Sequence, residues 1–221
     1  GKITGERCEL GRVTRFEYAA DLHLVSRRIN PDGSQLKYRY DNARLLLTEI
    51  ENESGEKYQL DYWPGGLIRQ ETGFDGRRTA YAYDLSGHLL QKTEFGDDDS
   101  RLVTGYHRNS AGRLLVKTLP DGKKVEYHYD ALGRLTRVDD NNDHPLEFEY
   151  DEQDRLVTEH QGWGTLRYRY NACGQLDHMR LPDHSKLDFH LAQGGALAAI
   201  DLNGSRLSSH AFVAGRERQR Q

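Results

Sequence analysis

One nine-residue phrase returns along this chain at a nearly constant interval. Clear copies occupy residues 81–89, 127–135, 148–156 and 168–176, and weaker copies occupy residues 38–46, 60–68 and 189–197. The second anchor of each copy falls at positions 18, 40, 62, 83, 108, 129, 150, 170 and 191, in steps of 20 to 25 residues. A fixed period through almost the whole chain is the signature of a repeat architecture, so it decides the fold class first.

The phrase from Tyr127 to Leu135 has the pattern of a β-hairpin. Tyr127 and Tyr129 are two residues apart and therefore lie on one face of a strand. The Asp and Gly that follow favour a turn, because Asp bonds to its own backbone and Gly takes a positive φ without steric cost. A second strand begins at Leu135 and ends at another turn signal, such as Pro-Asp-Gly at 120–122 in the preceding repeat. Each repeat is therefore predicted to be one hairpin with a tight turn at both ends.

The residues predicted to anchor the repeat serve structure, not chemistry. An apolar residue stands six places after every second anchor, at the start of the second strand. Rings that recur at the same place in each hairpin are expected to form cross-strand ladders. The predicted anchors are Tyr38, Tyr40, Tyr62, Tyr81, Tyr83, Tyr127, Tyr129, Tyr150, Tyr168, Tyr170, Gly87, Gly112, Gly133, Gly174, Leu89, Leu114, Leu135, Leu156 and Leu176.

A single hairpin is marginally stable in water, so the repeats are expected to pair edge to edge in one antiparallel strip. The right-handed twist of strands predicts that such a strip coils. We expect residues 1–15 to be a partial leading repeat, residues 16–205 an array of about nine hairpins, and residues 206–221 the start of a further repeat. Both ends fall within the pattern, which suggests a piece of a longer polypeptide.

The composition favours a thin sheet over a globular core. Hydrophobic residues make up 36% of the chain and charged residues 30%, which fits a single sheet with one wet face. The net charge of −4, with both signs interspersed, argues against a nucleic-acid partner. No apolar run approaches the roughly 18 residues of a transmembrane helix, and no signal peptide is visible. The distant Cys8 and Cys173 are expected to be reduced thiols.

No motif for catalysis, cofactor binding or metal binding emerges from the pattern. His184 and His190 are six residues apart, without a third ligand nearby in sequence, so a metal site there is not favoured. A nucleophile elbow, a phosphate loop and a dinucleotide fingerprint are all absent. The step of 25 residues predicts a longer surface loop at 97–100, and residues 139–143 form another polar turn without calcium-loop spacing. We expect the chain to have no catalytic, cofactor-binding or metal-binding residues.

The turn Gly162-Trp163-Gly164 is the most conspicuous aromatic turn. An exposed Trp163 could stack on a sugar or on a partner. The favoured interpretation is that its ring folds onto the neighbouring hairpin.

The recurring phrase resembles the YD repeats of Rhs proteins, and the resemblance covers nearly the whole chain. The tail from His210 to Glu217 also resembles a phrase of bacterial Rhs cores. The resemblance implies a β-strip wound into a hollow cocoon that encloses a C-terminal toxin domain, often an effector of type VI secretion. Arg108 and Leu191 depart from the pattern at the second anchor, and no Asp-Pro motif of the self-cleaving core end is present.

What the resemblance implies about partners concerns the whole protein. The expected partners are the remaining Rhs repeats, the enclosed toxin domain, a VgrG-like secretion spike protein, a chaperone and an immunity protein. The expected location is the cytoplasm during synthesis and target cells after secretion. The fragment is expected to be a non-enzymatic shell segment used in competition between bacteria.

Two other function classes remain open. The first alternative is a carbohydrate- or surface-binding module of β-hairpin repeats, although such repeats are usually rich in Trp and this chain has two. The second is an enzyme on a β-propeller, in which two hairpins make one blade of about 40 residues. A propeller predicts that alternate repeats differ from each other, and no such doubled period is visible.

Overall fold

The computed structural model of the chain is all-β and describes residues 1–20, 22–41, 43–192, 194–213 and 216–220. Contacts divide it into two compact units, each described here by itself. The first contains 1–107 and 118–121, and the second contains 108–117 and 122–221. Residues 42 and 193 of two weaker copies, and residues 214, 215 and 221 of the predicted further repeat, lie outside the described part.

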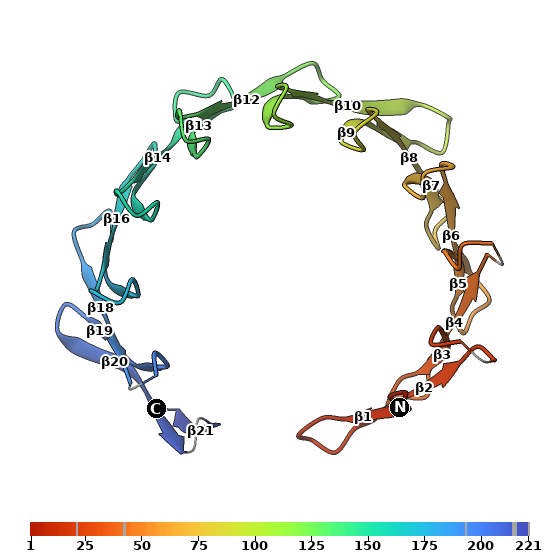
Figure 1. Cartoon of the computed structure of the whole chain (residues 1–221), viewed down its shortest axis with the longest axis horizontal. Helices are drawn as coiled ribbons and strands as arrows, with labels where there is room; N and C mark the ends of the chain where they lie inside the picture. The colour runs from red at the N-terminus through yellow and green to blue at the C-terminus, as the bar shows by residue number, and fades with distance from the viewer. Residues whose placement is uncertain (21, 42, 193, 214–215, 221) are drawn as a thin grey trace. The chain divides into compact units, whose positions relative to one another are not determined.

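Strands follow one another as antiparallel neighbours in chain order within each unit, as Figure 1 shows. Among the described residues, the pairings within each unit join strands that are consecutive in the chain, so they include no crossover. The strands are β1 (Gly5–Arg7), β2 (Val13–Tyr18), β3 (Val25–Ile29), β4 (Gln35–Tyr40), β5 (Leu47–Glu51), β6 (Lys57–Tyr62), β7 (Ile68–Thr72), β8 (Arg78–Tyr83), β9 (Leu89–Phe95), β10 (Arg101–Arg108), β11 (Leu114–Thr118), β12 (Lys124–Tyr129), β13 (Leu135–Asp139), β14 (Leu146–Tyr150), β15 (Leu156–Gln161), β16 (Thr165–Tyr170), β17 (Leu176–Arg180), β18 (Lys186–Leu191), β19 (Leu197–Leu202), β20 (Ser205–Val213) and β21 (Arg216–Arg220). The prediction of tandem antiparallel hairpins is confirmed.

The turn after each second anchor has the predicted chemistry. The amide of Gly133 donates to the carbonyl of Asp130 at 2.9 Å, and Gly133 has φ of 85°. The Asp130 carboxylate accepts from the amides of Leu132 and Arg134 at 3.0 and 2.9 Å. In the turns at 109 and 171 an Asn side chain accepts the same two bonds. Asp or Asn followed by Gly therefore closes the hairpin by local bonds alone.

A β-bulge, which the repeat pattern does not predict, recurs opposite the second anchor of the hairpins. Tyr129 pairs with Leu135, whereas His128 pairs with Arg137, so Thr136 is an extra residue in β13. The same shift occurs opposite Tyr18, Tyr40, Tyr62, Tyr83, Tyr150, Tyr170 and Leu191. A bulge interrupts the ladder and increases the local twist, so each hairpin carries the same local distortion.

The ring face shows a different ladder from the one expected. In β4, β5 and β6 the residues directly opposite one another are Tyr38, Ile50 and Tyr58. Tyr168 likewise lies opposite Met179. The second strand contributes an aliphatic side chain in these hairpins but a charged one in three others, where Leu60 lies opposite Glu71, Tyr81 opposite Lys92 and Phe148 opposite Glu159. The rings therefore do not form a continuous ring-on-ring ladder.

The longer surface loop expected at 97–100 was a wrong prediction. The turn is as tight as the others, since Gly96 and Ser100 close it with a backbone bond of 2.9 Å. The extra residues of the long repeat extend strands β9 and β10, which have 7 and 8 residues and pair in regular register. Strand extension satisfies the backbone groups of the extra residues within the ladder, which a loop would leave to water.

Neither unit contains a thick core. Among the described residues, Ala199 is the buried hydrophobic one, and the anchor leucines and tyrosines are half-buried. The accessible surface is 15241 Å², whereas a compact globular chain of this mass exposes about 10,000 Å². The structure is therefore one layer thick within each unit, and the ring face is not covered by a second layer.

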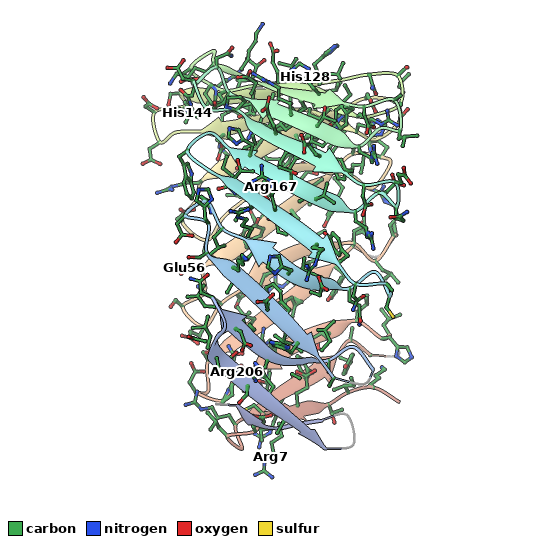
Figure 2. All side chains as sticks on the ribbon, turned by 90° about the vertical axis from the view of Figure 1, so that its left-hand side faces the viewer. Arg7, Glu56, His128, His144, Arg167 and Arg206 are labelled. Atoms are coloured by element: carbon green, nitrogen blue, oxygen red, sulfur yellow. The ribbon has the colours of Figure 1, made fainter. Side chains whose placement is uncertain are left out.

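Turns at one margin of the second unit pack directly against each other. Figure 2 shows Arg167 in the middle of a strand and His144 at this margin. A Cβ atom on Gly162 would overlap His144, and one on Gly164 would overlap Pro182. Both glycines are required here because neighbouring turns approach the backbone too closely for any side chain.

We predict that Gly164→Ala destabilises the chain by about 1–3 kcal/mol, because the new methyl group collides with the Pro182 ring. The matched control is Gly65→Ala, since Gly65 also lies in a turn but has open space at the Cβ position. Urea unfolding of both variants measures the difference. Equal midpoints for the two variants would show that the turns do not pack as described.

Candidate functional site

The most regular contact of the structure joins successive hairpins through a tyrosine hydroxyl. The Tyr150 hydroxyl donates to the carbonyl of Leu135 at 2.8 Å, and Leu135 is the residue that pairs with the previous second anchor, Tyr129. The same bond, here called the tyrosine tie, joins Tyr18 to Ile3, Tyr40 to Val25, Tyr62 to Leu47, Tyr129 to Leu114 and Tyr170 to Leu156, at 2.6–2.9 Å. Each tie spans 14 or 15 residues and fastens one hairpin to the one before it.

At Val25, Leu47, Leu135 and Leu156, a bulge explains why the carbonyl is available to accept the tie. An extra residue next to a ladder position leaves that part of the strand without its regular partner. A half-buried carbonyl without a partner costs free energy, and the phenol that reaches it from the next hairpin removes this cost. The bulge thus leaves a carbonyl free, and the tyrosine of the next hairpin bonds to it.

Positions that depart from the repeat lose the tie. Arg108 stands at a second-anchor position and donates instead to the carbonyl of Gly112 in its own turn at 3.3 Å. Leu191 has no donor. In the described part of the chain the Tyr83 hydroxyl makes no such bond, although burial raises the pKa of its phenol. The predicted leucine anchors are half-buried at the starts of their strands: Leu89, Leu114, Leu135, Leu156 and Leu176. The first-anchor tyrosines Tyr38, Tyr81, Tyr127 and Tyr168 are also half-buried.

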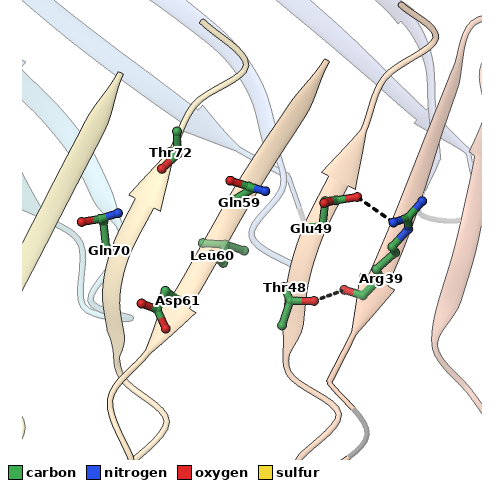
Figure 3. A pocket seen from close by; sticks show the side chains of 8 residues that line it. All are labelled: Arg39, Thr48, Glu49, Gln59, Leu60, Asp61, Gln70 and Thr72. Atoms are coloured by element: carbon green, nitrogen blue, oxygen red, sulfur yellow. Dashed lines mark hydrogen bonds and ion pairs between the residues drawn. The ribbon is translucent and has the colours of Figure 1, made fainter. Parts of the chain in front are cut away.

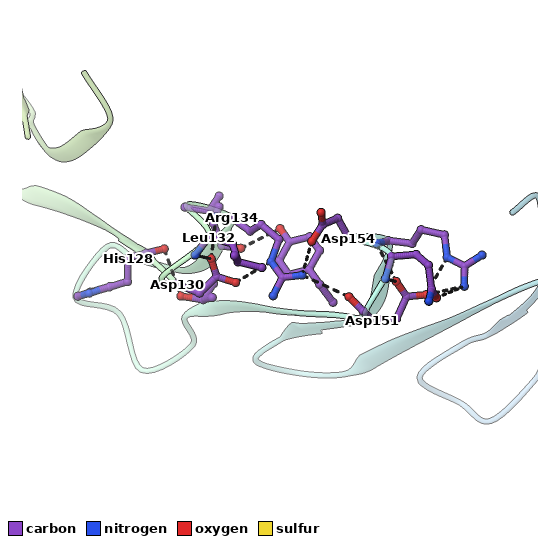
Figure 4. Close-up of polar contacts among 11 residues, drawn as sticks. His128, Asp130, Leu132, Arg134, Asp151 and Asp154 are labelled. Atoms are coloured by element: carbon purple, nitrogen blue, oxygen red, sulfur yellow. Dashed lines mark hydrogen bonds and ion pairs between the residues drawn. The ribbon is translucent and has the colours of Figure 1, made fainter. Parts of the chain in front are cut away.

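An arginine adds a second connection between hairpins, as Figure 4 shows for Arg134. Its guanidinium bonds to Asp130 in its own turn at 2.6 Å and to Asp154 in the next turn at 2.7 Å. The same guanidinium lies 4.9 Å from the ring centre of Tyr150, so it stacks on a tie tyrosine. Arg155 repeats this arrangement with Tyr170 at 4.8 Å, and Arg113 with Tyr129 at 5.9 Å.

The turn carboxylates are held in their charged form. The backbone amide of Arg134 donates to Asp130 and, with the Arg134 side chain, lowers the pKa of that carboxyl. The bond to Asp130 also raises the pKa of Arg134. Backbone bonds from His88 and Arg44 act in the same direction on the pKa of Asp84 and Asp41. These charges stabilise turns and do not make a catalytic pair.

Two carboxylates that were not predicted as functional residues, Glu71 and Glu159, lie on the ring face. Glu71 accepts a hydrogen bond of 2.5 Å from each of the Tyr58 and Tyr81 hydroxyls. The hydrogen bond that Tyr58 donates to Glu71, together with burial, raises the pKa of Tyr58 to about 12. Burial and the bond to Glu159 likewise raise the pKa of Tyr168 to about 12. Both carboxylates accept hydrogen bonds from phenol groups on a half-apolar face, namely from the first anchors Tyr81 and Tyr168 and from Tyr58, two residues before a first anchor. The alternation of side chains along the strands could have revealed that these carboxylates share a face with the rings.

The histidines and Trp163 were also placed by the structure. His184 lies in a turn with φ of 70°, and His190 bonds to Asp201 at 2.8 Å. Among the described residues, no group of three or more His, Cys, Asp or Glu could hold a metal ion. Within the same range there is no helix long and apolar enough to cross a membrane. The expectation for Trp163 was wrong: its ring is 75% exposed, because the backbone of this turn, not the ring, packs against the neighbours.

Comparison with known families gives the repeat its name. Residues 108–145 match the family model described as RHS Repeat. The chain carries Rhs repeats. This match includes the repeat in which Arg108 replaces the second anchor, so the deviation lies within the variation of Rhs repeats.

Several curated relatives of this Rhs-repeat chain are named as toxins or nucleases. The chain is 29% identical over 178 residues to the double-stranded DNA deaminase toxin A of Burkholderia cenocepacia (strain H111), covering 80% of this chain and 10% of that protein. It is 32% identical over 209 residues to the toxin protein Tse5 of Pseudomonas aeruginosa (strain PAO1), covering 83% of this chain and 15% of that protein. The chain thus spans about a tenth of the length of the first relatives it matches.

Solved structures share the fold. The crystal structure of TcdB2-TccC3 without its hypervariable C-terminal region matches with a TM-score of 0.66 and 14% identity, covering 97% of this chain and 14% of that one. The crystal structure of TcdB2-TccC3 matches with the same TM-score at 13% identity, covering 95% and 13%. This similarity shows that the Rhs repeats here have the fold of a segment of those larger chains.

We predict that Tyr40→Phe destabilises the Rhs repeats by about 1 kcal/mol, because it removes one tyrosine tie and leaves the Val25 carbonyl without its donor. The matched control is Tyr38→Phe in the same strand and on the same face, where the hydroxyl makes no tie. Urea unfolding midpoints measure both. If both variants lose the same stability, the tie is not what the second tyrosine contributes.

We predict that the chain loses stability as the pH falls below about 4. The pKa of Asp130 is lower in the folded state than its ordinary value, so its contribution is present above that value and is lost as acid protonates the carboxyl. Asp130→Asn keeps the turn bonds, as Asn109 and Asn171 do in other repeats. The free energy of unfolding of this variant should therefore fall less steeply with decreasing pH than that of the unaltered chain. If the two chains lose stability equally below about pH 4, Asp130 does not contribute as described.

Proposed function

We propose that these Rhs repeats form a non-catalytic segment of a shell wall that encloses a toxin domain. The observation that carries the proposal is the tyrosine tie, which recurs at six second-anchor positions and fastens those hairpins to the ones before them. A tie between neighbours can be repeated without limit, whereas a core around one centre cannot. An array of this kind makes a continuous surface and not a compact domain.

The single-layer architecture supports a wall. The described residues bury little apolar surface for their number, so stability comes from ladder, turn and tie bonds spread evenly over the array. A closed sheet leaves no free strand edges and excludes water and proteases from the space behind it. We infer that the anchor residues named above are the structural determinants, and that residues 16–205 are the repeat array with partial repeats at 1–15 and 206–221.

The named relatives support a toxin domain as the enclosed domain. Proteins named as a DNA deaminase toxin, as the toxin Tse5 and as a probable deoxyribonuclease all contain a region similar to this chain, although the named activities differ. A shared segment among different activities is what a common container predicts. We therefore propose a cocoon that carries a C-terminal toxin domain from the cytoplasm of its producer into target cells.

Further partners follow from the same proposal. A carrier delivered between bacteria needs a VgrG-like spike protein to load it, a chaperone for its assembly and an immunity protein in the producer. These partners are proposed for the whole protein, with their binding surfaces outside the repeats.

The test uses the full-length protein that contains this segment. We predict that Tyr129→Phe, Tyr150→Phe and Tyr170→Phe together open the wall, by about fivefold for each lost tie, so that protease reaches the C-terminal domain faster. The rate of limited proteolysis of that domain is the measurement. The matched control combines Tyr38→Phe and Tyr106→Phe, which alter first anchors that make no tie.

The outcome separates a wall from an active part of the toxin. The C-terminal domain made alone, without the repeats, should keep its toxicity. Its sensitivity to protease should not depend on the repeat substitutions, because no repeats surround it. If the triple variant protects the domain as well as the unaltered protein does, enclosure by these repeats is wrong.

A further inference from the structure

On the face of the sheet opposite the ring face, here called the polar face, strand β8 of the first unit has smaller side chains than the other repeats. At the residue between the two anchors, the chain has Glu17, Arg39, Asp61, His107, His128, Glu149, Arg169 and His190, all long or charged, but Ala82 in the strand β8. Two residues earlier β8 has Ala80, where its neighbours have Lys37 and Gln59. Ala80 and Ala82 lie on one face, so they leave this face uncovered at β8.

A hollow of about 330 Å³ lies over these two alanines. The register places Asp61, Gln70, Ala80 and Thr93 directly opposite one another across β6 to β9, so polar groups flank the alanine on both sides. The indole of Trp63 forms a further side and is 42% exposed. An open hollow with one aromatic wall and several polar side chains has the composition of a small-molecule site.

The Trp63 ring is held in place and does not simply project into solvent. Its indole nitrogen donates to the carbonyl of Tyr81 in the next hairpin at 3.1 Å. The Arg69 guanidinium lies 5.8 Å from the ring centre and is itself paired with Asp61. The ring is therefore fixed at the hollow without net charge beside it, because Arg69 and Asp61 neutralise each other.

The polar groups around the hollow retain hydrogen-bonding capacity. In the described part of the chain the Gln70 carboxamide has no partner, and a carboxamide offers two donors and one acceptor. Gln91 bonds to the buried Thr93 hydroxyl at 3.0 Å and keeps its carbonyl oxygen. A neighbouring hollow, shown in Figure 3, shares Asp61 and Gln70 and adds the carboxamide of Gln59.

The second hollow also contains a buried acceptor. Oε1 of Glu49 is shielded from solvent and accepts no hydrogen bond, although Arg39 pairs with it at 3.2 Å. A shielded oxygen with an unmet hydrogen bond favours a ligand that donates one. Both hollows lie on one face and share two residues, so one elongated ligand can occupy both.

We propose that these two hollows bind a neutral oligosaccharide. One sugar ring stacks on Trp63 above Ala80 and Ala82, where its C–H face meets the aromatic wall. Sugar hydroxyls, which both donate and accept, match the carboxamides of Gln70 and Gln59 and the oxygen of Glu49. An anionic ligand is disfavoured by Glu49 and Asp61, and a cationic one by Arg39 and Arg69. The proposal does not depend on whether the repeats enclose a toxin.

Binding is tested by fluorescence with the whole chain. The chain has two tryptophans, so Trp163→Phe leaves Trp63 as the single reporter. The probes are maltohexaose, cellohexaose and chitohexaose. At least one of them should change the Trp63 emission in a saturable manner.

The decisive variant is Ala82→Arg in the Trp163→Phe chain. Arginine stands at the same repeat position in Arg39 and Arg169, so the fold accepts it, and circular dichroism checks this. The longer side chain fills the hollow and should weaken binding by about tenfold or more, equivalent to about 1.4 kcal/mol. Gln70→Ala should weaken the same binding without filling the hollow.

The matched control is Glu149→Ala, which places a small residue at the same position of another repeat, one without a Trp beside it. It should leave sugar affinity unchanged. The proposal is overturned if none of the three sugars binds, if Ala82→Arg binds as tightly as its parent, or if an uncharged Gly/Ser peptide competes as well as the sugar.

Discussion

The structure depends on a phenol hydroxyl that reaches a backbone carbonyl one hairpin back. In an array one layer thick, no core collects side chains from distant parts of the chain, so each hairpin must be fixed by its neighbours. Ladder bonds alone fix the spacing of strands but allow register to slip, because a slip preserves most backbone pairs. The tie from Tyr150 to Leu135 removes that freedom, since its donor and acceptor meet in one register only.

The tie also explains why bulge, tyrosine and arginine occur together. The extra residue Thr136 frees the Leu135 carbonyl, Tyr150 donates to it, and Arg134 covers the Tyr150 ring while holding the turns on either side. Each contact alone is worth about 1 kcal/mol or less in a half-exposed site. Because these contacts recur along the array, their combined free energy is enough to hold the hairpins together. At Arg108 and Leu191 a single tie is absent.

The period predicted the hairpins, the turns and the thin sheet, because those properties follow from local residue types. Asp130 and Gly133 close their turn with bonds inside five residues, so the sequence was sufficient there. The bulge was not predictable from spacing, since an extra residue in one strand changes no interval between anchors. Glu71 was missed because its partners, Tyr58 and Tyr81, lie in the strands on either side of it, 13 and 10 residues away. The loop at 97–100 was misassigned because a longer interval does not reveal whether the added residues join the ladder.

The two faces of the sheet are under different constraints, and this difference determines where binding can evolve. The ring face carries the donors of the ties, so a substitution there weakens the contact between hairpins. The polar face carries charged rows such as Lys37 with Glu51, in which at least one partner is exposed and each pair contributes little individually. Having Ala80 and Ala82 in place of long polar residues therefore costs the array little stability and opens space beside Trp63. A repeat array can acquire a ligand site on this face without loss of the contacts that join its hairpins.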